Sequence, residues 1–304
     1  MATKVALAGA TGNIGLPVLN SLLAAGFPVT VLTRKGSNST SRIPKDSKVT
    51  IREVDYSDVS SLTEALKGVD VVVSTLATQA AGEQTPLIDA AVAAGVTRFI
   101  PSEFGSDTAN PKTAQLPVFK GKVDTVAYLK TKVEETAKAG KPSFSYTQIF
   151  NGPFFDWGLR VGFIVNPAQH SAVVYNGGDV PFSTSTLDTI GQAVVGVIRH
   201  LGETANRPVY VQDALVTQNQ LIQYAKDKDG IEWSITHKDT EKVKEESLAE
   251  LAKGFNGPAL GALISTAIYN KEYGGNYTGH LDNDLLGIKG LSDAEVRKLV
   301  ESLL

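Results

Sequence analysis

The chain has 304 residues, of which 42% are hydrophobic and 20% charged, a balance typical of a folded protein with a sizeable core. A net charge of −3 without a basic cluster argues against nucleic acid as a partner, and no apolar stretch reaches the roughly 18 residues of a membrane span. There is no cysteine, which excludes disulfides, thiol nucleophiles and thiolate metal sites. The four histidines fit no short metal-ligand spacing, and the N-terminus lacks a signal-peptide pattern, so we expect a cytoplasmic protein with no metal site.

Residues 4–34 predict a strand, a glycine-rich turn, a helix and a second strand. The apolar run 4–8 precedes Gly-Ala-Thr-Gly-Asn-Ile-Gly at 9–15, and the run 29–32 predicts the second strand. Between them, helical spacing is kept by Ile14, Val18, Leu19, Leu22 and Leu23. Glycines allow a sharp turn and the close approach of a phosphate, and the first turn of the helix offers free N–H groups. The spacing is a G-x-x-G-x-x-G variant of the Rossmann fingerprint, so we expect a dinucleotide here rather than a turn without a ligand.

The end of the second strand predicts which nicotinamide cofactor binds. An NAD site has an Asp or Glu about 20 residues after the glycine motif, whereas an arginine meets the 2′-phosphate of NADP. This strand ends in Leu-Thr-Arg-Lys at 32–35 and offers no carboxylate. We therefore predict NADPH or NADP as the cofactor, with Arg34 gripping the phosphate and Lys35 beside it. The alternative is a pair of exposed basic side chains in a loop.

Strand and helix patterns keep alternating as far as residue 150. We expect strands at 49–54, 69–74, 98–101 and 144–149, and helices at 60–67, 86–94 and about 124–139. Repeated βα units predict an α/β fold, in which a Rossmann-like, doubly wound parallel sheet carries helices on both faces.

The regular alternation weakens after Asn151, where aromatic residues and glycines cluster. We place a domain boundary here, with an NADP-binding Rossmann domain at 1–152 and a smaller, mainly helical substrate-binding domain at 153–304. Within the second part, a helix at 186–198 and a strand at 208–211 are predicted. The segment of about 186–217 that contains them is expected to return to the first domain.

In parallel sheets of this kind, ligands lie beyond the carboxyl ends of the strands. The residues expected to bind the cofactor therefore come from the glycine turn and from the segments that follow the strands: Gly9, Thr11, Gly12, Asn13, Ile14, Gly15, Arg34, Lys35, Leu76, Ala77, Gln79, Ser102, Glu103, Phe104, Phe150, Asn151 and Pro153.

The predicted helix at 124–139 carries a Tyr-x-x-x-Lys pair and a lysine of uncertain role. At about 100° per residue, Lys130 projects within the apolar arc of this helix, while Tyr128 and Lys132 project away from it. The Tyr–Lys spacing is therefore interpreted as accidental. Burying a lysine ammonium costs free energy of desolvation unless a ligand or a protein group forms a hydrogen bond or ion pair with it. Lys130 is therefore either a functional group or a side chain that extends to solvent from the edge of the apolar arc.

Several segments together resemble one branch of the atypical short-chain dehydrogenases and reductases. They are the glycine turn, Arg34, Pro-Ser-Glu-Phe-Gly-Ser-Asp at 101–107, Lys-Thr-Lys-Val-Glu at 130–134 and Asn-Gly-Pro-Phe-Phe at 151–155. The branch is the NmrA-like, isoflavone reductase-like family, which includes phenylcoumaran benzylic ether and pinoresinol-lariciresinol reductases. Glu134 and Glu135 stand where plant members usually have two arginines, so the chain looks closer to fungal or microbial members.

The resemblance implies a catalytic lysine beside the nicotinamide, and Lys130 falls on that position. It implies an NADPH-dependent reductase that transfers a hydride to a small unsaturated, carbonyl or aryl-ether/quinone-methide-like substrate. Lys130 would act as general acid or oxyanion stabiliser and help to place the cofactor.

Four aromatic residues are expected to bind the substrate, although ordinary core packing would also explain any one of them: Phe104, Phe154, Phe155 and Trp157. The expected partner is a small molecule, without nucleic acid or membrane, and the expected state is a monomer or homodimer. The same family also contains non-catalytic proteins that bind NADP and sense redox state. A redox sensor or regulator is therefore the alternative function, although such a protein would not need a lysine beside the nicotinamide.

Overall fold

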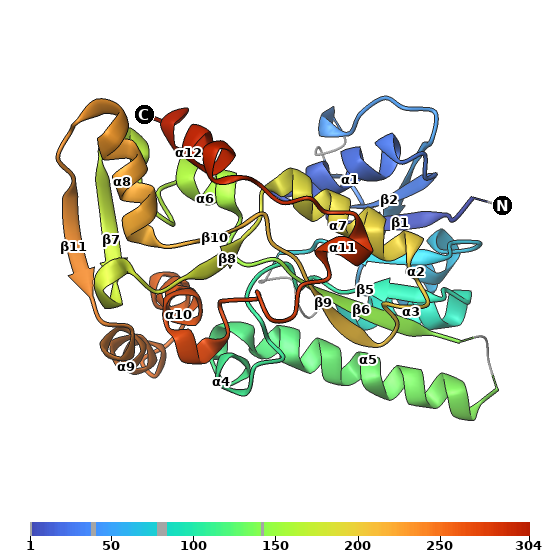
Figure 1. The fold of residues 1–304 in the computed structure, drawn as a ribbon. Helices are drawn as coiled ribbons and strands as arrows, with labels where there is room; N and C mark the ends of the chain where they lie inside the picture. The colour runs from blue at the N-terminus through green and yellow to red at the C-terminus, as the bar shows by residue number, and fades with distance from the viewer. Residues whose placement is uncertain (1, 38–40, 78–83, 141–142) are drawn as a thin grey trace.

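A seven-stranded parallel sheet, with six strands from the first half of the chain and β9 from the second, forms the centre of the Rossmann-like part of the molecule (Figure 1). The computed structural model describes residues 2–37, 41–77, 84–140 and 143–304. The strand order is β3-β2-β1-β4-β5-β6-β9, and every neighbouring pair is parallel. The strands are β1 (Val5–Ala8), β2 (Val29–Arg34), β3 (Val49–Val54), β4 (Val71–Ser74), β5 (Arg98–Ile100), β6 (Ser145–Phe150) and β9 (Arg207–Tyr210). The predicted Rossmann-like sheet is confirmed.

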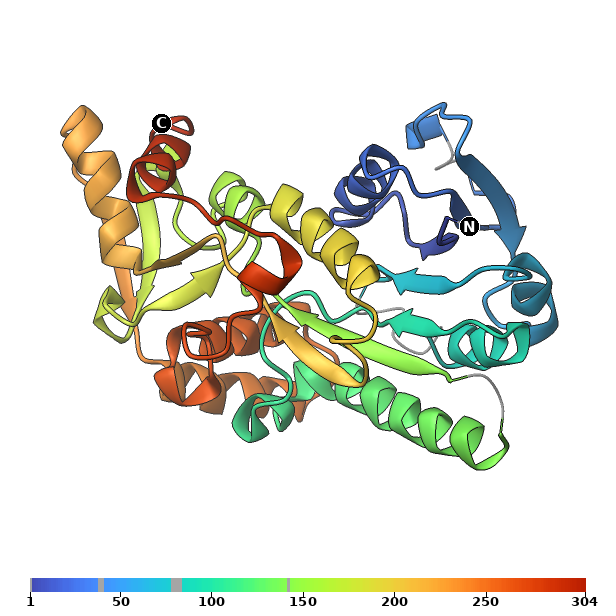
Figure 2. The ribbon, with the colours of Figure 1, turned by 45° about the vertical axis from the view of Figure 1, so that its right-hand side comes forward.

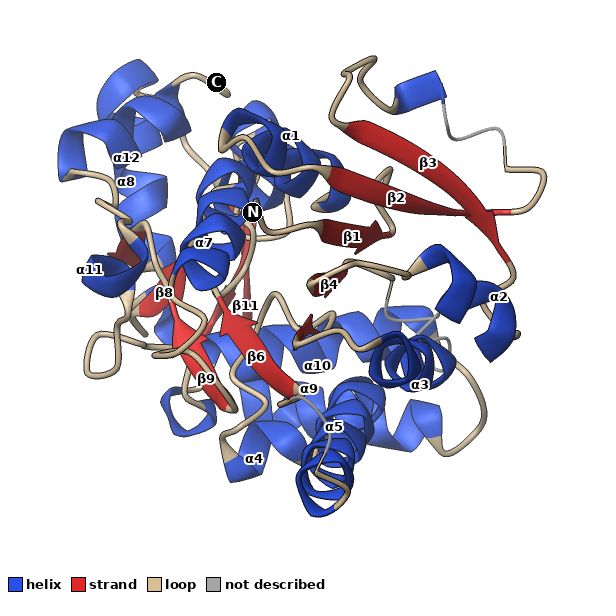
Figure 3. Ribbon diagram, turned by 90° about the vertical axis from the view of Figure 1, so that its right-hand side faces the viewer, coloured by secondary structure: helices blue, strands red, loops and turns tan. Residues whose placement is uncertain are grey.

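Alternate residues of β1 face two different helical layers because side chains of a strand point to opposite faces in turn. Val5 and Leu7 pack with α1 (Gly15–Ala24) and α7 (Leu187–Arg199), whereas Ala6 and Ala8 belong to the cluster on the other face. That face is covered by α2 (Val59–Ala65), α3 (Gln84–Ala94) and α5 (Lys120–Lys138). Figure 3 shows α1 and α7 on one side of the sheet and α3 and α5 on the other. The central strands β1, β4 and β5 are therefore buried on both faces, as their apolar residues indicate, whereas the edge strand β3 is largely exposed.

The chain after β6 forms a second body and also returns to the sheet. The predicted strand at 208–211 appears as β9, which pairs with β6 at the sheet edge (Figure 2), and α7 packs on α1. The second body contains two small sheets, antiparallel β8–β10 and parallel β7–β11, among its helices. Its elements are α6 (Phe155–Arg160), β7 (Ser171–Tyr175), β8 (Phe182–Thr184), β10 (Ala214–Val216), α8 (Gln218–Asp229), β11 (Ser234–Lys238), α9 (Thr240–Leu251), α10 (Gly257–Tyr269) and α12 (Asp293–Glu301).

Short helices connect several of these elements. They are α4 (Pro111–Ala114), η3 (Pro117–Phe119), η4 (Pro167–Gln169), η5 (Asn176–Gly178), η6 (Lys271–Tyr273) and α11 (Asn283–Leu286). Of these, η3 runs directly into α5, which therefore begins at Lys120, four residues before the start that the sequence pattern predicts. In the described ranges, no helix combines the length and the apolar character that a membrane crossing requires.

A buried arginine ties the returning strand to the centre of the sheet. Arg98 is almost fully buried, and its guanidinium donates hydrogen bonds to the hydroxyls of Ser145, Thr147 and Thr204 at 2.8, 2.8 and 2.9 Å. It also donates to the carbonyl of Leu201, in the turn between α7 and β9. Burial lowers the pKa of Arg98 to about 10. One cation therefore joins β5, β6 and the connection into β9.

Replacing Arg98 with Ala should lower the thermal unfolding midpoint by about 5 °C or more, because it leaves buried hydroxyls and a carbonyl without their partner. Circular dichroism melts would measure the change. The control is Lys67→Ala at an exposed position, which should change the midpoint little. Equal midpoints for the Arg98 variant and the wild type would show that the guanidinium does not hold these elements together.

Candidate functional site

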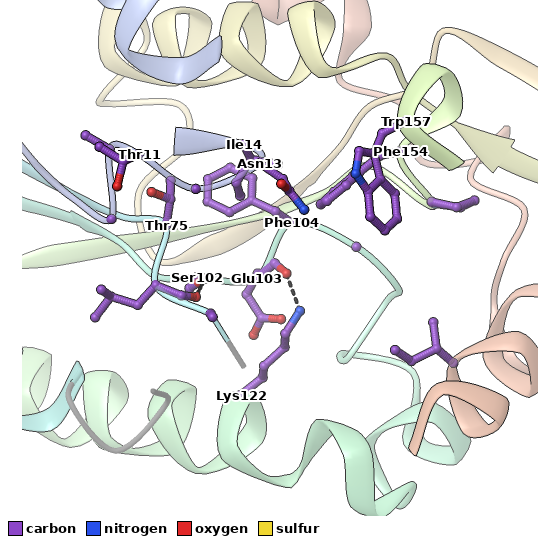
Figure 4. A pocket seen from close by; sticks show the side chains of 18 of the residues that line it. Thr11, Asn13, Ile14, Thr75, Ser102, Glu103, Phe104, Lys122, Phe154 and Trp157 are labelled. Atoms are coloured by element: carbon purple, nitrogen blue, oxygen red, sulfur yellow. Dashed lines mark hydrogen bonds between the residues drawn. The ribbon is translucent and has the colours of Figure 1, made fainter. Parts of the chain in front are cut away.

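A cavity of about 800 Å³ runs along the carboxyl ends of β1, β2, β4 and β5 and continues to the second body (Figure 4). Its sheet side is lined by the glycine turn, the end of β2 and the loops after β4 and β5. Its other side is lined by apolar residues, among them Trp157, Phe163, Ile264 and Ile268. Ligand sites are usually concave and mainly apolar, with a few placed polar groups, and this cavity has that character.

Close backbone packing explains the outer glycines of the turn at 9–15. Gly9 has φ +81°, and a Cβ there would lie 2.7 Å from the carbonyl oxygen of Thr75. A Cβ on Gly15 would lie 2.1 Å from the carbonyl oxygen of Gly9, so Gly15 serves packing and does not line the cavity. Helix α1 begins at Gly15, and no side chain caps its first turn at Ile14. The turn therefore presents a glycine cradle and an uncapped helix N-terminus to the cavity.

The basic end of β2 lies at the same cavity. Arg34 lines it together with Ser37 and Tyr56, and the Tyr56 hydroxyl donates to the carbonyl of Leu32 at 3.2 Å. Arg34 also borders a smaller depression of about 410 Å³, which Lys35 lines. Arg34 and Lys35, the two cations predicted to bind the 2′-phosphate, therefore both line this smaller depression.

The loop after β5 is held in a strained conformation against the cavity. Phe104 has φ +35°, in the left-handed region that a bulky residue rarely adopts, yet it is buried. The Ser102 hydroxyl donates to the carbonyl of Leu76 at 2.6 Å, and the Ser102 N–H donates to the side chain of Gln84 at 2.9 Å. Strain of this kind persists only where the surroundings impose it, and it concentrates at functional sites.

Glu103 lies fully buried in this loop and lines the cavity. Its carboxylate accepts the Thr108 hydroxyl at 3.1 Å on both oxygens and the Gln148 amide at 3.4 Å. Burial raises the pKa of this carboxyl group, while the charge of Lys122 opposes the rise.

Lys122, in the first turn of α5, brings an ammonium group to the cavity. Its Nζ donates a hydrogen bond to the carbonyl oxygen of Glu103 (Figure 4). Burial lowers the pKa of Lys122, and the carboxylate of Glu103 partly offsets this effect. A lysine whose pKa is lowered in this way can give up a proton more readily than one in water.

Lys130 lies two turns further along α5, is exposed, and does not line the cavity. The prediction that it projects into a buried arc is therefore wrong. The buried side of the helix is formed by Thr125, Val126 and Leu129, which place Lys130 toward solvent. Of the lysines of α5, it is Lys122 that lines the cavity.

The Tyr-x-x-x-Lys pair lies outside the cavity as well. The Tyr128 hydroxyl donates to Asp89 of α3 at 2.6 Å, and the Lys132 ammonium lies 3.2 Å from the same carboxylate. The pair joins α5 to α3, in agreement with the interpretation that its spacing is accidental.

The other predicted residues fall into three groups. The cavity wall contains Gly9, Thr11, Gly12, Asn13, Ile14, Arg34, Leu76, Ala77, Ser102, Glu103, Phe104, Pro153, Phe154 and Trp157. Three residues do not line it: Phe150 packs on the ring of Tyr210, Asn151 donates its amide to the carbonyl of Gly152, and Phe155 belongs to the core of the second body. Gln79 lies outside the described residues.

Sequence reasoning missed several residues of the cavity wall. Lys122 and Phe119 lie before residue 124, where the sequence pattern predicts the helix to begin. Ile264 and Ile268 are four apart, which places them on one helix face, but that spacing does not tell which cavity the face meets. Ser106 and Tyr56 also line the cavity, and the segments after β5 and β3 that carry them were the available signal.

The chain is similar to known proteins over most of its length. The model of the NmrA-like family matches residues 1–285. An Aspergillus flavus protein named oxidoreductase aprR is 33% identical over 283 residues, which cover 91% of each chain. Bifunctional pinoresinol-lariciresinol reductase 2 of Thuja plicata is 25% identical over 311 residues, covering 97% of this chain and 93% of that protein.

Solved structures share the fold over nearly their whole length. The complex of leucoanthocyanidin reductase from Vitis vinifera with NADPH superposes with a TM-score of 0.78 at 22% identity, covering 99% of both chains. The Escherichia coli NADPH-dependent quinone oxidoreductase QOR2 with NADPH superposes with a TM-score of 0.72 at 20% identity, covering 98% of this chain and 99% of that one.

Since the family match covers most of the chain and one relative is 33% identical over 91% of it, the chain belongs to the NmrA-like family.

Proposed function

We propose that the protein is an NADPH-dependent reductase of a small aromatic or unsaturated carbonyl compound. The observation that carries the proposal is the position of Lys122, whose ammonium group meets a cavity that is basic and glycine-lined at one end and aromatic at the other. Homologues named as oxidoreductases and reductases support the reaction class. A protein that only senses the redox state of NADP would not require the Lys122 ammonium at the aromatic end of the cavity.

The residues present fit NADPH. A dinucleotide diphosphate fits the cradle because Gly9 packs closely on Thr75, Gly15 packs closely on Gly9, and α1 begins without a side-chain cap. Arg34 and Lys35 supply cations for a 2′-phosphate, and no acidic side chain follows β2 directly to favour NAD. Further along the cavity, Leu76, Ser102 and Pro153 would enclose the rest of the cofactor.

When bound, NADPH supplies a hydride for an electron-poor carbon. Lys122 holds a proton at its Nζ, next to the carbonyl of Glu103, and would deliver it to the substrate oxygen on which charge develops. Phe104, Phe154 and Trp157 would pack against the substrate and exclude water, which strengthens the interaction between the ammonium and that oxygen.

A direct test is to mix the protein with NADPH and a panel of enones, aryl ketones, quinones, aryl ethers and imines, and to follow the cofactor absorbance. Consumption of NADPH with at least one class is the expected result. Tight binding of NADPH without turnover across the panel would contradict the proposal and favour a redox sensor.

Replacing Lys122 with Ala should lower kcat by about 100-fold or more, because general acid catalysis contributes about that much, while the Kd of NADPH stays nearly unchanged. Lys130→Ala is the matched control from the same helix and should keep wild-type kcat. Steady-state kinetics and calorimetric titration of NADPH give both quantities. The reverse outcome, with loss in the Lys130 variant only, would place the reactive lysine where the sequence suggested.

The turnover rate should fall as the pH rises through the pKa of Lys122, because the proton donor is then lost. Burial places this pKa below the ordinary value of 10.5, so the alkaline fall should occur below pH 10.5. The pH profile of kcat measures it. In Lys122→Arg the side chain stays charged, and the alkaline limb should vanish together with most of the activity. A wild-type profile that stays flat to pH 10.5 would contradict the role of Lys122 as an acid.

Arg34→Ala should raise the Kd of NADPH by roughly 10- to 100-fold and change the Kd of NADH far less, because a charged hydrogen bond to the 2′-phosphate is lost. Titration calorimetry with both cofactors measures the difference. Equal losses for NADH and NADPH would remove the phosphate-binding role of Arg34.

A further inference from the structure

Strand β11 forms an open edge of the second body. It pairs in parallel with β7, and all five of its residues are exposed. Figure 1 shows β11 at the outer margin of the molecule, with β7 on its inner side. Among the described strands, none adjoins the outer side of β11. An edge of this kind presents N–H and C=O groups to which another strand can pair.

The pairing with β7 determines which backbone groups of β11 point outward. The N–H group of Ser234 donates to the carbonyl of His170 at 2.8 Å, and alternate residues of a strand in a parallel pair bond to the same neighbour. Thr236 and Lys238 therefore also face β7, whereas Ile235 and His237 turn their N–H and C=O groups away from it. In the described part of the chain, nothing accepts the N–H groups of Ile235 and His237.

Exposed apolar side chains gather at this edge. Ile235 is 37% exposed, Ile231 in the segment before the strand is 47% exposed, and Val173 of β7 is 38% exposed. The segment 231–239 contains no proline, which natural edge strands often use to prevent pairing. The edge therefore combines unpaired backbone groups with apolar surface.

The sequence of this edge is complementary to itself when two copies run antiparallel with Ile235 opposite Ile235. Ser234 then lies opposite Thr236, Trp233 opposite His237, and Glu232 opposite Lys238. Because the arrangement has two-fold symmetry, the Glu232–Lys238 pair occurs twice. Opposite charges and apolar residues that lie directly across an antiparallel pair stabilise it.

The two charged side chains are available for this contact. Glu232 is 89% exposed and has one ion pair within its own chain, to Lys226 at 2.6 Å. Lys238 forms no ion pair with any residue that the structure describes. Antiparallel pairing centred on Thr236 would instead place Ser234 opposite Lys238 and Trp233 opposite Asp239. Charge complementarity therefore favours the pairing centred on Ile235.

The same pairing satisfies the outward backbone groups. In an antiparallel pair, residues directly opposite each other exchange both hydrogen bonds at alternate positions. With Ile235 at the centre, Ile235 bonds to Ile235 and His237 bonds to Trp233 of the second copy. These are the residues whose backbone groups point away from β7.

We propose that two copies of this chain associate by antiparallel pairing of their β11 strands around a two-fold axis at Ile235. Strands β7 and β11 of both copies then form one four-stranded sheet. Neither strand lines the cavity, so this inference is independent of the reaction.

The test is the oligomeric state of the full chain and of charge-exchanged variants. Sedimentation equilibrium from about 5 to 500 µM gives the Kd of the dimer, a range chosen because a small interface binds weakly. We expect a dimer of the wild type, and Lys238→Glu should raise its Kd about 10-fold or more by placing like charges opposite twice. The double variant Glu232→Lys/Lys238→Glu restores opposite charges and should return the Kd to within about 3-fold of the wild type.

The matched control is Lys67→Glu, the same charge change at a remote exposed position, which should leave the Kd unchanged. A second pair of variants tests the backbone contacts. Ile235→Pro removes an outward N–H group and should abolish the dimer, whereas Ile235→Val keeps it. Circular dichroism melts show whether each variant is folded.

Hydrogen exchange followed by NMR locates the contact. The amides of Ile235 and His237 should gain protection as the protein concentration rises, whereas the Thr236 amide, which faces β7, should be protected at all concentrations. A wild type that stays monomeric at the highest concentration would overturn the proposal. So would a dimer that Lys238→Glu leaves intact, or one that the double variant does not restore.

Discussion

The site depends on one contact, the hydrogen bond from the Lys122 ammonium to the carbonyl oxygen of Glu103. It joins the first turn of α5 to the loop after β5, two segments that the sheet topology brings together. An ammonium group in a largely apolar cavity loses hydration, and a main-chain carbonyl replaces only part of it. The carbonyl holds the lysine in place, while burial in the cavity leaves the ammonium short of solvation and so lowers the pKa of Lys122.

Several features of the fold serve this contact. Phe104 keeps φ +35°, and the Glu103 carboxylate is held by Thr108 and Gln148 behind the carbonyl that Lys122 meets. Residues of α6 and α10 line the opposite side of the cavity. The polar groups near Lys122 and the apolar side chains that face them therefore come from different parts of the chain. The loop that carries the Pro-Ser-Glu-Phe-Gly stretch therefore combines a strained backbone at Phe104 with a buried carboxylate at Glu103.

Much of the fold could be predicted from the sequence because it follows from local patterns. Apolar runs separated by amphipathic helices specify parallel strands. The roles of the glycine turn and of Arg34 can be inferred from sequence because both lie within a single βαβ unit. Lys130 was misplaced because a helical wheel gives relative directions but not which arc the neighbouring elements cover. The short helix η3 moved the start of α5 to Lys120, and that start decides which lysine reaches the cavity. The positions of Ile264 and Ile268 in the cavity wall depend on how α10 packs against distant parts of the chain, which no local sequence pattern specifies.

Lys122, and not Lys130, has the environment suited to proton transfer. NMR titration of the protein labelled with ¹³C at the lysine Cε positions tests it most directly, with the two signals assigned from Lys122→Arg and Lys130→Arg. We expect the Lys122 signal to titrate below the ordinary pKa of 10.5 and to move when NADP⁺ is added, whereas the Lys130 signal should not move with NADP⁺. A Lys122 signal that titrates at or above 10.5 and ignores the cofactor would contradict it.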